Sequence, residues 1–330
     1  MNRLSVLGAG AWGTALARVL APRFESVRLW VYERDLAIQI ERDRENAVYL
    51  PGFRLPANVA AFADFQPVLE GSEVVLSVLP SHGVRAVFGN ISSYLRPEMI
   101  FVSATKGLES GTLCRMSQVI AQSVRFEPRT VVLSGPTFAR EVASGKPAAV
   151  VAASSDQEAS REVRERFSGP TLRVYSGSDP VGVEIGGAVK NVIAIGAGVC
   201  DGLELGHNAL AALITRGLVE MTRLAVAMGG KTATLSGLAG LGDLVLTCTG
   251  ELSRNRSVGL KLAAGRTLTD ILNSGPTVAE GVKTTAAAVE LASRHSVEMP
   301  IAQQMHAMLN LGRPPSDAVR ELMERSLKME

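Results

Sequence analysis

Lys190 stands in a run of small and apolar residues, GGAVKNVIA at 186–194, which is typical of a helix. An unpaired ammonium group is costly to bury, and burial lowers the pKa of a lysine. A lysine with a lowered pKa can exchange a proton near neutral pH, so Lys190 is a candidate for proton transfer. The alternative is a lysine at a helix end whose ammonium group reaches solvent.

A second lysine, Lys106, follows an apolar β-type run in the segment SATKG. Loops at the carboxyl ends of parallel strands face the ligand cleft, so a lysine there points to substrate contact. The segment from Ser103 to Lys106 also fits the SxxK pattern of penicillin-binding enzymes. Because the SDN and KTG partners of that pattern are missing, we interpret this match as accidental.

A phosphate clamp is suggested by the segment GLAGLGDLVLTCTGELSRNRS at 237–257. It carries Asp243 after a glycine-rich turn and then Ser253-Arg254-Asn255 at an expected helix start. A serine at the N-cap, a guanidinium fork and an amide can together hold a phosphate group. A helix cap or a salt bridge is the alternative for either piece.

Gly8, Gly10 and Gly13 lie between an apolar run and the helix-forming stretch TALARVL. In this strand–loop–helix context the first glycine allows a tight turn and the second lets a pyrophosphate approach the backbone. The third lets the helix pack against the sheet. The helix N-terminus then faces the phosphates, which predicts a dinucleotide site.

The next expected strand ends at Tyr32-Glu33-Arg34, with Glu33 placed 20 residues after Gly13. A carboxylate at this position usually binds the ribose hydroxyls of NAD, whereas an arginine can bind the extra phosphate of NADP. Glu33 and Arg34 therefore argue for opposite cofactors. A solvated charged turn is the alternative.

The elements that would position these side chains begin with apolar β-type runs that alternate with helix-forming segments. Strands that are apolar on both faces indicate a parallel sheet with helices on both sides. The fold class is thus α/β, beginning with a Rossmann-type doubly wound parallel sheet. The loops GAGAWG, LPSH, ATKG and SGPT should share one edge of it. Expected strands are 4–7, 27–32, 73–80, 99–107, 130–136, 148–154 and 172–176.

Beyond residue 180 the β-type runs stop, and glycine-punctuated helical segments follow. We expect two domains: a dinucleotide-binding domain over residues 1–180 and an all-helical substrate and catalytic domain over 181–330. An apolar helical half is also suited to forming a homodimer. The expected helices of this half lie at 183–198, 212–228, 282–295 and 302–311.

Composition excludes several classes of protein. The 330 residues carry 34 Lys and Arg against 32 Asp and Glu, a net charge of +2, so no basic surface for nucleic acid is expected. No uninterrupted apolar run suits membrane insertion, and the N-terminus lacks a secretory signal. The three cysteines and four histidines have no metal-ligand spacing, so no metal is expected. We expect a cytoplasmic protein with free thiols.

Ten short sequence segments between Leu4 and Ile301 together resemble the bacterial-type NAD(P)-dependent glycerol-3-phosphate dehydrogenases. The resemblance implies reversible reduction of dihydroxyacetone phosphate to sn-glycerol 3-phosphate, which supplies phospholipid synthesis. The matching segments, in order, are GAGAWGTALA, NAVYLPG, ATKGLE, SGPTFAREVASG, GGAVKNVIAIGAGVCDGL, ALITRGLVEM, GLAGLGDLVLTCTG, SRNRSVG, VAEGVKT and VEMPI.

The resemblance also implies site residues. It makes Lys190 the proton donor or acceptor, within a catalytic set of Lys190, Lys106 and Asp243. Substrate positions are Lys106, Gly135, Thr137, Lys190, Asp243, Ser253, Arg254 and Asn255. Cofactor positions, besides the three glycines and residues 32–34, are Ala11, Trp12, Tyr49, Lys106, Ala139, Arg254, Val278 and Glu280.

The family pattern favours NADPH, with NADH possible. Tyr32-Glu33 departs from the His- or Arg-containing pair common in the family, which puts the NADPH preference in doubt but not the reaction class. His207 also differs from many relatives and has no assigned role.

Two other functions remain open from the sequence. One is a related dehydrogenase acting on a β-hydroxyacid or a sugar acid phosphate, since this architecture serves several substrates. The SRN block at 253–255 argues against it. The other is a non-catalytic NAD(P)H sensor, which no DNA-reading module or basic stripe supports.

Overall fold

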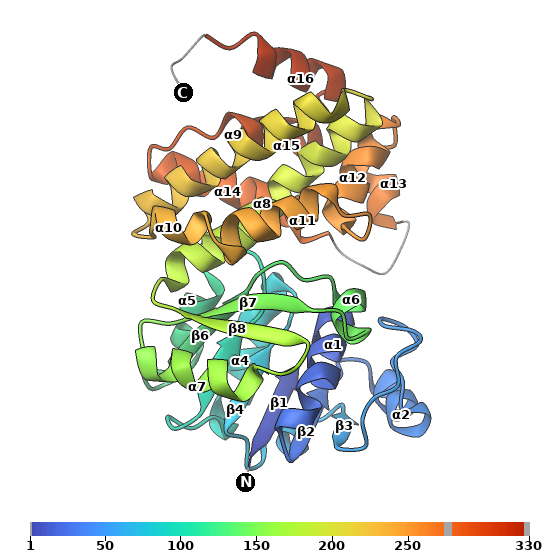
Figure 1. The fold of residues 1–330 in the computed structure, drawn as a ribbon, viewed down its shortest axis with the longest axis vertical. Coiled ribbons are helices and arrows are strands. Elements are labelled where there is room, and N and C mark those ends of the chain that lie inside the picture. The colour runs from blue at the N-terminus through green and yellow to red at the C-terminus, as the bar shows by residue number, and fades with distance from the viewer. Residues whose placement is uncertain (1, 274–278, 327–330) are drawn as a thin grey trace.

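A computed structural model describes residues 2–273 and 279–326. An eight-stranded sheet occupies one end of the molecule and helices fill the other (Figure 1). The strand order is β3-β2-β1-β4-β5-β6-β7-β8. The strands are β1 (Arg3–Leu7), β2 (Ser26–Trp30), β3 (Val59–Phe62), β4 (Val74–Ser77), β5 (Ile100–Ser103), β6 (Arg129–Ser134), β7 (Ala148–Ala153) and β8 (Leu172–Gly177).

The sheet is mostly parallel, which confirms the predicted fold class, and it departs from parallel pairing at one place. Strands β1 to β6 all pair in parallel, whereas β7 runs antiparallel to β6 and β8 follows the direction of β7. The segment between β6 and β7 contains only the short helix α6 (Ala139–Ala143), which packs beside α1 (Ala11–Leu20). Because this segment does not cross a face of the sheet, the chain must return in the opposite direction.

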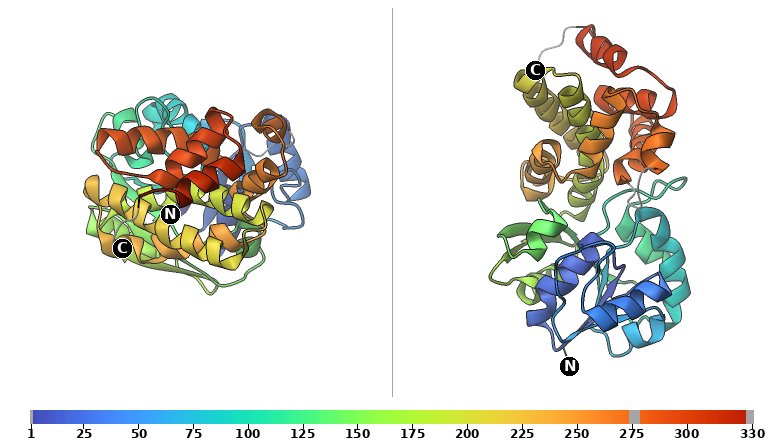
Figure 2. Two further views of the ribbon diagram at one scale, coloured as in Figure 1. Left: turned by 90° about the horizontal axis from the view of Figure 1, so that it is seen from above. Right: turned by 90° about the vertical axis from the view of Figure 1, so that its right-hand side faces the viewer.

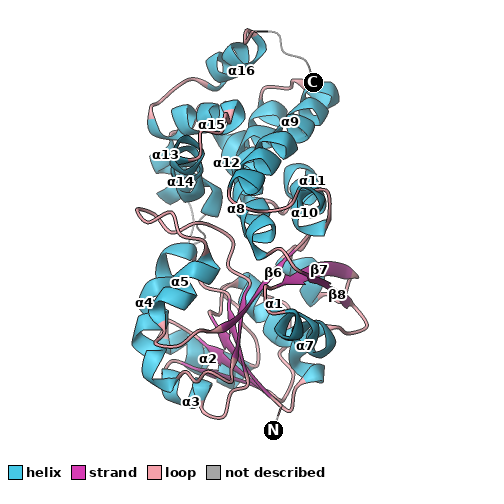
Figure 3. Cartoon of the chain, turned by 90° about the vertical axis from the view of Figure 1, so that its left-hand side faces the viewer, coloured by secondary structure: helices cyan, strands magenta, loops and turns pink. Residues whose placement is uncertain are grey.

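Helices cover both faces of the sheet, which confirms the doubly wound arrangement (Figure 3). On one face Leu16 of α1 and Phe167 of α7 pack in one apolar cluster with strand residues, and on the other Phe88 of α4 packs with Phe101. Strands β4 and β5 are buried along their whole length. The remaining helical elements of this half are η1 (Ala21–Arg23), α2 (Arg34–Asp43), α3 (Phe65–Leu69), η2 (Ser81–Gly83), α4 (Val84–Ile91), η3 (Ser92–Tyr94), α5 (Met116–Ser123) and α7 (Gln157–Phe167).

Helices alone follow β8 within the described residues, and they gather at one end of the molecule (Figure 2). Helix α8 starts directly after the sheet and passes through the middle of this half (Figure 1). The elements are α8 (Pro180–Gly202), α9 (Gly206–Ala227), α10 (Thr232–Leu235), η4 (Leu238–Gly242), α11 (Asp243–Thr249), α12 (Arg254–Ala263), α13 (Leu268–Asn273), α14 (Glu280–Arg294), α15 (Pro300–Asn310) and α16 (Pro315–Met323).

Helix α8 forms the centre of the second apolar core. Among the described helices it alone is long and apolar enough to cross a membrane, with a mean hydropathy of 1.4 over its most apolar stretch. That stretch is 100% buried within the protein, so α8 is the core helix of this half. Its apolar residues pack against α9, α11, α12, α14 and α15.

Close packing of two glycines sets the distance between α8 and α12. A Cβ atom on Gly259 of α12 would lie 1.9 Å from the carbonyl oxygen of Ile195. A Cβ atom on Gly198 of α8 would lie 1.9 Å from the carbonyl oxygen of Arg256. The two backbones therefore touch at positions where only glycine fits. This contact fixes the start of α12, where Arg254 stands, relative to α8, which carries Lys190.

We predict that Gly259→Ala lowers the free energy of unfolding by about 1 to 3 kcal/mol, because the added methyl group must separate the two helices. Denaturant unfolding measures the change. Gly89→Ala in α4 is the matched control, since its Cβ would meet no atom within 4 Å. The control should be neutral or stabilising by up to about 1 kcal/mol. Equal stability of the two variants would contradict this account of the contact.

Candidate active site

One buried carboxylate is shared by two lysines at the junction of the sheet and the helical half. Asp243, the first residue of α11, is 0% exposed, and Lys190 in the middle of α8 is 5% exposed. Lys190 Nζ donates a hydrogen bond to Asp243 Oδ1. Lys106 Nζ donates to Asp243 Oδ2 at 2.6 Å. We call Lys106, Lys190 and Asp243 the ionic cluster. The burial of Lys190 rules out the alternative that its ammonium reaches solvent.

The pKa of Lys190 is lowered to about 7. Burial is the largest cause, and the positive charge of Lys106 adds to it, while the carboxylate of Asp243 acts in the opposite direction. This is the direction that the sequence predicts. Near neutral pH the amine is thus present in both its neutral and its protonated form, as a group that exchanges protons requires.

Thr247 is part of this site although sequence reasoning missed it. Lys190 Nζ donates to Thr247 Oγ1 at 2.8 Å, and Thr247 Oγ1 donates to the carbonyl oxygen of Asp243 at 2.6 Å. Its position in the sequence could have indicated this contact, because a residue four positions after Asp243 on a helix lies on the same face as Asp243.

The loop after β6 contacts the ionic cluster through its backbone. Lys106 Nζ donates to the carbonyl oxygen of Gly135 at 3.2 Å, and Thr137 Oγ1 donates to the same oxygen at 3.2 Å. Gly135 has a φ of +152°, and a Cβ atom there would lie 2.9 Å from Ala149 O of β7. Only glycine therefore fits at this position. The loops after β5 and β6 meet here, as the shared-edge expectation requires.

The three residues of the expected phosphate clamp have different environments. Ser253 is the N-cap of α12, and its Oγ accepts from the backbone N–H of Arg256 at 3.2 Å. Asn255 Nδ2 donates to Asn191 Oδ1 at 2.9 Å, and its Oδ1 accepts from the N–H of Gly281 at 3.0 Å. Asn255 therefore ties α12 to α8 and α14.

Arg254 is exposed, and its guanidinium has no hydrogen bond or ion pair with any residue in 2–273 or 279–326. As the first residue of α12 it stands at the positive end of the helix dipole. The guanidinium group of Arg254 is thus available to bind an anion.

The glycine loop after β1 fits a dinucleotide. Gly8 has a φ of +111°, and a Cβ atom on Gly13 would lie 1.9 Å from Gly8 O. A Cβ atom on Gly10 would meet nothing within 4 Å, which leaves space for a phosphate beside the backbone. Helix α1 begins at Ala11 with no side-chain cap and no acidic residue in its first turn. Its first N–H groups are therefore available to an anion.

The remaining cofactor candidates lie around this loop. Trp12 packs with Ala11 and Ala139 in one small apolar cluster between α1 and α6. Glu280 at the start of α14 accepts a hydrogen bond from Ser81 Oγ at 2.9 Å, which links it to the loop after β4. Val278 lies outside the described residues.

At the end of β2, Tyr32 is 82% exposed, and Tyr49 Oη donates to Glu33 Oε1 at 2.7 Å. Arg34 Nη2 lies 2.8 Å from Asp64 Oδ1, and both side chains are exposed. These residues lie at a different place from the ionic cluster. His207 is exposed on α9 and lies outside both groups.

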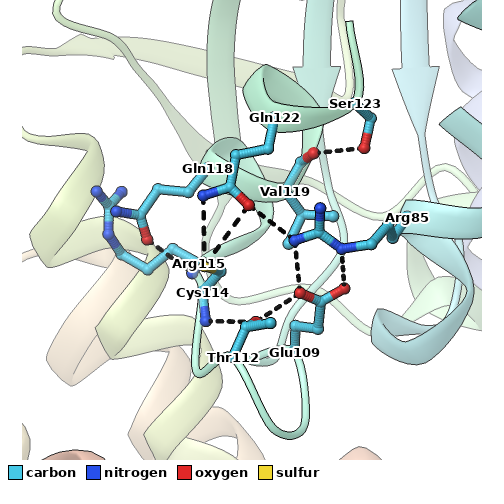
Figure 4. A network of polar contacts seen from close by, with 9 residues as sticks. All are labelled: Arg85, Glu109, Thr112, Cys114, Arg115, Gln118, Val119, Gln122 and Ser123. Atoms are coloured by element: carbon cyan, nitrogen blue, oxygen red, sulfur yellow. Dashed lines mark hydrogen bonds and ion pairs between the residues drawn. The ribbon is translucent and has the colours of Figure 1, made fainter. Parts of the chain in front are cut away.

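A polar network holds the loop that follows Lys106 (Figure 4). Arg85 on α4 binds both carboxylate oxygens of Glu109, at 2.8 and 2.7 Å. At the far end of the loop, Arg115 lies 2.5 Å from the buried Glu184 of α8, which also accepts from Ser117 N at 2.7 Å. No local sequence pattern indicates this link between the loop of Lys106 and the helix of Lys190, because Arg115 and Glu184 are 69 residues apart in the chain.

The fold and the site together define a class of protein, a dinucleotide-dependent oxidoreductase with a helical second half. Sequence models of the NAD-dependent glycerol-3-phosphate dehydrogenase N-terminus and C-terminus match residues 3–160 and 179–320. The chain belongs to the NAD-dependent glycerol-3-phosphate dehydrogenase family.

Full-length relatives agree with this family. The chain is 57% identical over 329 residues to glycerol-3-phosphate dehydrogenase [NAD(P)+] of Koribacter versatilis, covering 98% of each chain. It is 51% identical to the Geobacter sp. (strain M21) protein of the same name, covering 100% of this chain and 99% of the relative. The crystal structure of glycerol-3-phosphate dehydrogenase from Coxiella burnetii superposes with a TM-score of 0.93 at 42% identity, covering 98% and 99% of the two chains.

We predict that Asp243→Asn destabilises the fold by about 3 to 5 kcal/mol near pH 6, because it leaves the buried ammonium of Lys190 without a carboxylate. The cost should shrink as the pH rises above about 7, where Lys190 is already neutral in the parent protein. Denaturant unfolding at both pH values measures this dependence.

The control is Asp317→Asn on α16, an exposed carboxylate 2.8 Å from Arg320, which should cost at most about 1 kcal/mol. A cost for Asp243→Asn that is small, or equal at the two pH values, would show that the carboxylate does not stabilise a charged Lys190.

Proposed function

We propose that the ionic cluster carries out the reversible reduction of dihydroxyacetone phosphate to sn-glycerol 3-phosphate, with Lys190 exchanging the proton on the C2 oxygen. The observation that carries this assignment is the buried ammonium group of Lys190, which is hydrogen-bonded to Asp243 and Thr247. Burial lowers its pKa, as a proton-exchanging group requires. When bound, the reduced nicotinamide supplies the hydride. Lys190 in its ammonium form stabilises the negative charge that develops on the oxygen and then donates its proton.

The other polar groups keep Lys190 in place and set its charge. Asp243 holds both ammonium groups, which fixes Lys190 Nζ relative to Lys106 Nζ. Thr247 Oγ1 accepts a second hydrogen bond from Lys190 Nζ. The ammonium group has three donors, so one N–H remains for the substrate oxygen. Lys106 contributes a second positive charge where the substrate oxygen becomes negative.

Substrate orientation is assigned to the start of α12. Arg254 binds the phosphate group of the substrate, and the N–H groups of the helix N-terminus assist. Binding energy at the phosphate then orients C2 for reaction. Lys106, Gly135, Thr137, Ser253 and Asn255 complete the proposed substrate contacts.

The proposed NAD(P)H site is the glycine loop and its surroundings. Gly8, Gly10 and Gly13 shape the loop, with the pyrophosphate at the N-terminus of α1. The end of β2 receives the adenosine ribose. The proposed cofactor contacts are residues 8, 10–13, 32–34, 49, 106, 139, 254, 278 and 280.

The division of the chain into domains at residue 180 is proposed from the change of architecture between β8 and α8. A cytoplasmic homodimer that supplies glycerol 3-phosphate for phospholipid synthesis is also proposed. Exposed apolar side chains support self-association, among them Leu205 (37%) and Val226 (46%) near the ends of α9 and Val245 (39%) on α11.

We predict that Lys190→Met lowers turnover of dihydroxyacetone phosphate about 10²- to 10⁴-fold, while the affinity for NAD(P)H is kept. In the parent enzyme, glycerol 3-phosphate oxidation should accelerate as the pH rises through about 7, because the neutral amine is the base. Steady-state absorbance assays give both results. Lys261→Met on α12 is the control and should retain its activity. Near-normal turnover of the Lys190 variant would remove Lys190 from the mechanism.

We predict that Arg254→Ala raises KM for dihydroxyacetone phosphate about 10- to 100-fold, the equivalent of one charged hydrogen-bonded contact. With dihydroxyacetone, which lacks the phosphate, the variant and the parent enzyme should be similarly poor. Arg266→Ala changes an exposed arginine beyond α12 and serves as the control. An unchanged affinity for dihydroxyacetone phosphate in a binding titration would contradict the proposed phosphate clamp.

A further inference from the structure

One buried side chain joins the glycine loop to the segment 46–49. Asn46 is 0% exposed, and its Nδ2 donates to Ala9 O at 2.7 Å and to Thr14 Oγ1 at 2.9 Å. Its Oδ1 accepts from the backbone N–H of Tyr49 at 3.1 Å. Ala9 lies between Gly8 and Gly10, so Asn46 fixes the position of Tyr49 relative to the phosphate-binding loop.

Tyr49 in turn fixes a carboxylate at the end of β2. Its hydroxyl donates to Glu33 Oε1 at 2.7 Å, while Glu33 is otherwise exposed. An exposed glutamate without such a bond would sample several rotamers. With Oε1 bound to Tyr49, Glu33 Oε2 has lone pairs left for further donors, such as the two hydroxyl groups of a ribose.

The charge at this place opposes an additional phosphate. Arg34, the residue that could bind a 2′-phosphate, is paired with Asp64 at 2.8 Å. The side chains of Glu33, Arg34 and Asp64 comprise two carboxylates and one guanidinium, so these three side chains together carry a charge of −1. A 2′-phosphate would bring up to about two more negative charges, whereas a ribose diol brings none and donates hydrogen bonds.

We propose that the Asn46–Tyr49–Glu33 chain of hydrogen bonds selects NADH over NADPH in this enzyme. Glu33 binds the ribose hydroxyls and repels a 2′-phosphate, and Tyr49 and Asn46 are positioning residues that hold its carboxylate. Arg34, the cation next to Glu33 in the chain, is itself paired with Asp64. This assignment rests on the proposed dinucleotide site, and it reverses the preference for NADPH that the family resemblance implies.

The test measures the dissociation constants of NADH and NADPH by reduced-nicotinamide fluorescence, with no other substrate present. The parent protein should bind NADH at least about 10-fold more tightly. Glu33→Gln keeps the shape of the side chain and removes its charge, so it should shift the ratio toward NADPH by about 10-fold or more. Asp64→Asn, which releases Arg34, should shift the ratio in the same direction.

Tyr49→Phe tests the positioning role separately. It should weaken NADH several-fold, and in the reductase assay the loss should fall mainly on KM for NADH. Adding Tyr49→Phe to Glu33→Gln should then change the NADH affinity little, because the carboxylate to be positioned is gone. Glu290→Gln on α14 is the control, an exposed glutamate paired with Arg294, and it should leave both dissociation constants unchanged.

Tighter or equal binding of NADPH by the parent protein would overturn the proposal, as would an unchanged ratio in Glu33→Gln. Glu33 is exposed, so its variant tests the proposal even where Tyr49→Phe fails to fold. Because binding is measured without the triose phosphate, failure of the proposed reaction leaves these results intact. Absence of binding for both dinucleotides would overturn the cofactor site itself.

Discussion

The buried carboxylate of Asp243 is the interaction on which the site depends. Burying the carboxylate of Asp243 and the ammonium of Lys190, with the ammonium of Lys106 half-buried beside them, is costly. The cost is offset only when the three groups meet with good geometry. Lys106 comes from the loop after β5, Lys190 from α8 and Asp243 from α11, so the sheet and two helices must be placed together. The same burial lowers the pKa of Lys190 to about 7 and so links the fold to the proposed proton transfer.

The rest of the structure supplies rigid support for this cluster. The glycine contact between α8 and α12 sets the distance from Lys190 to the start of α12, and Asn255 connects that start to α8 and α14. On the other side, Glu184 of α8 binds Arg115 at the end of the loop that begins with Lys106. The hydrogen bonds from Asn46 through Tyr49 follow the same principle, since a buried side chain fixes the exposed Glu33, the proposed ribose contact.

Local patterns predicted much of the fold. Apolar runs predicted every strand except β3, and the shared edge of β1, β2, β4, β5 and β6 follows from their parallel pairing. Strand β3 (Val59–Phe62) was missed because its alanines give little strand signal. The antiparallel direction of β7 was also missed, because an apolar run predicts a strand but not whether the strand pairs in parallel or antiparallel.

By itself, the sequence determined which residues can do chemistry, because glycine spacing in a strand–loop–helix segment and a lysine in an apolar helix are local features. The tertiary structure alone decided which of them meet. Lys190 and Asp243 are 53 residues apart in the chain, and Lys106 and Asp243 are 137 apart. Thr247, Glu184 and the chain from Asn46 to Glu33 acquire their roles only through such contacts. Hydrogen bonds and ion pairs depend on distances of a few ångströms, and the folded backbone sets those distances.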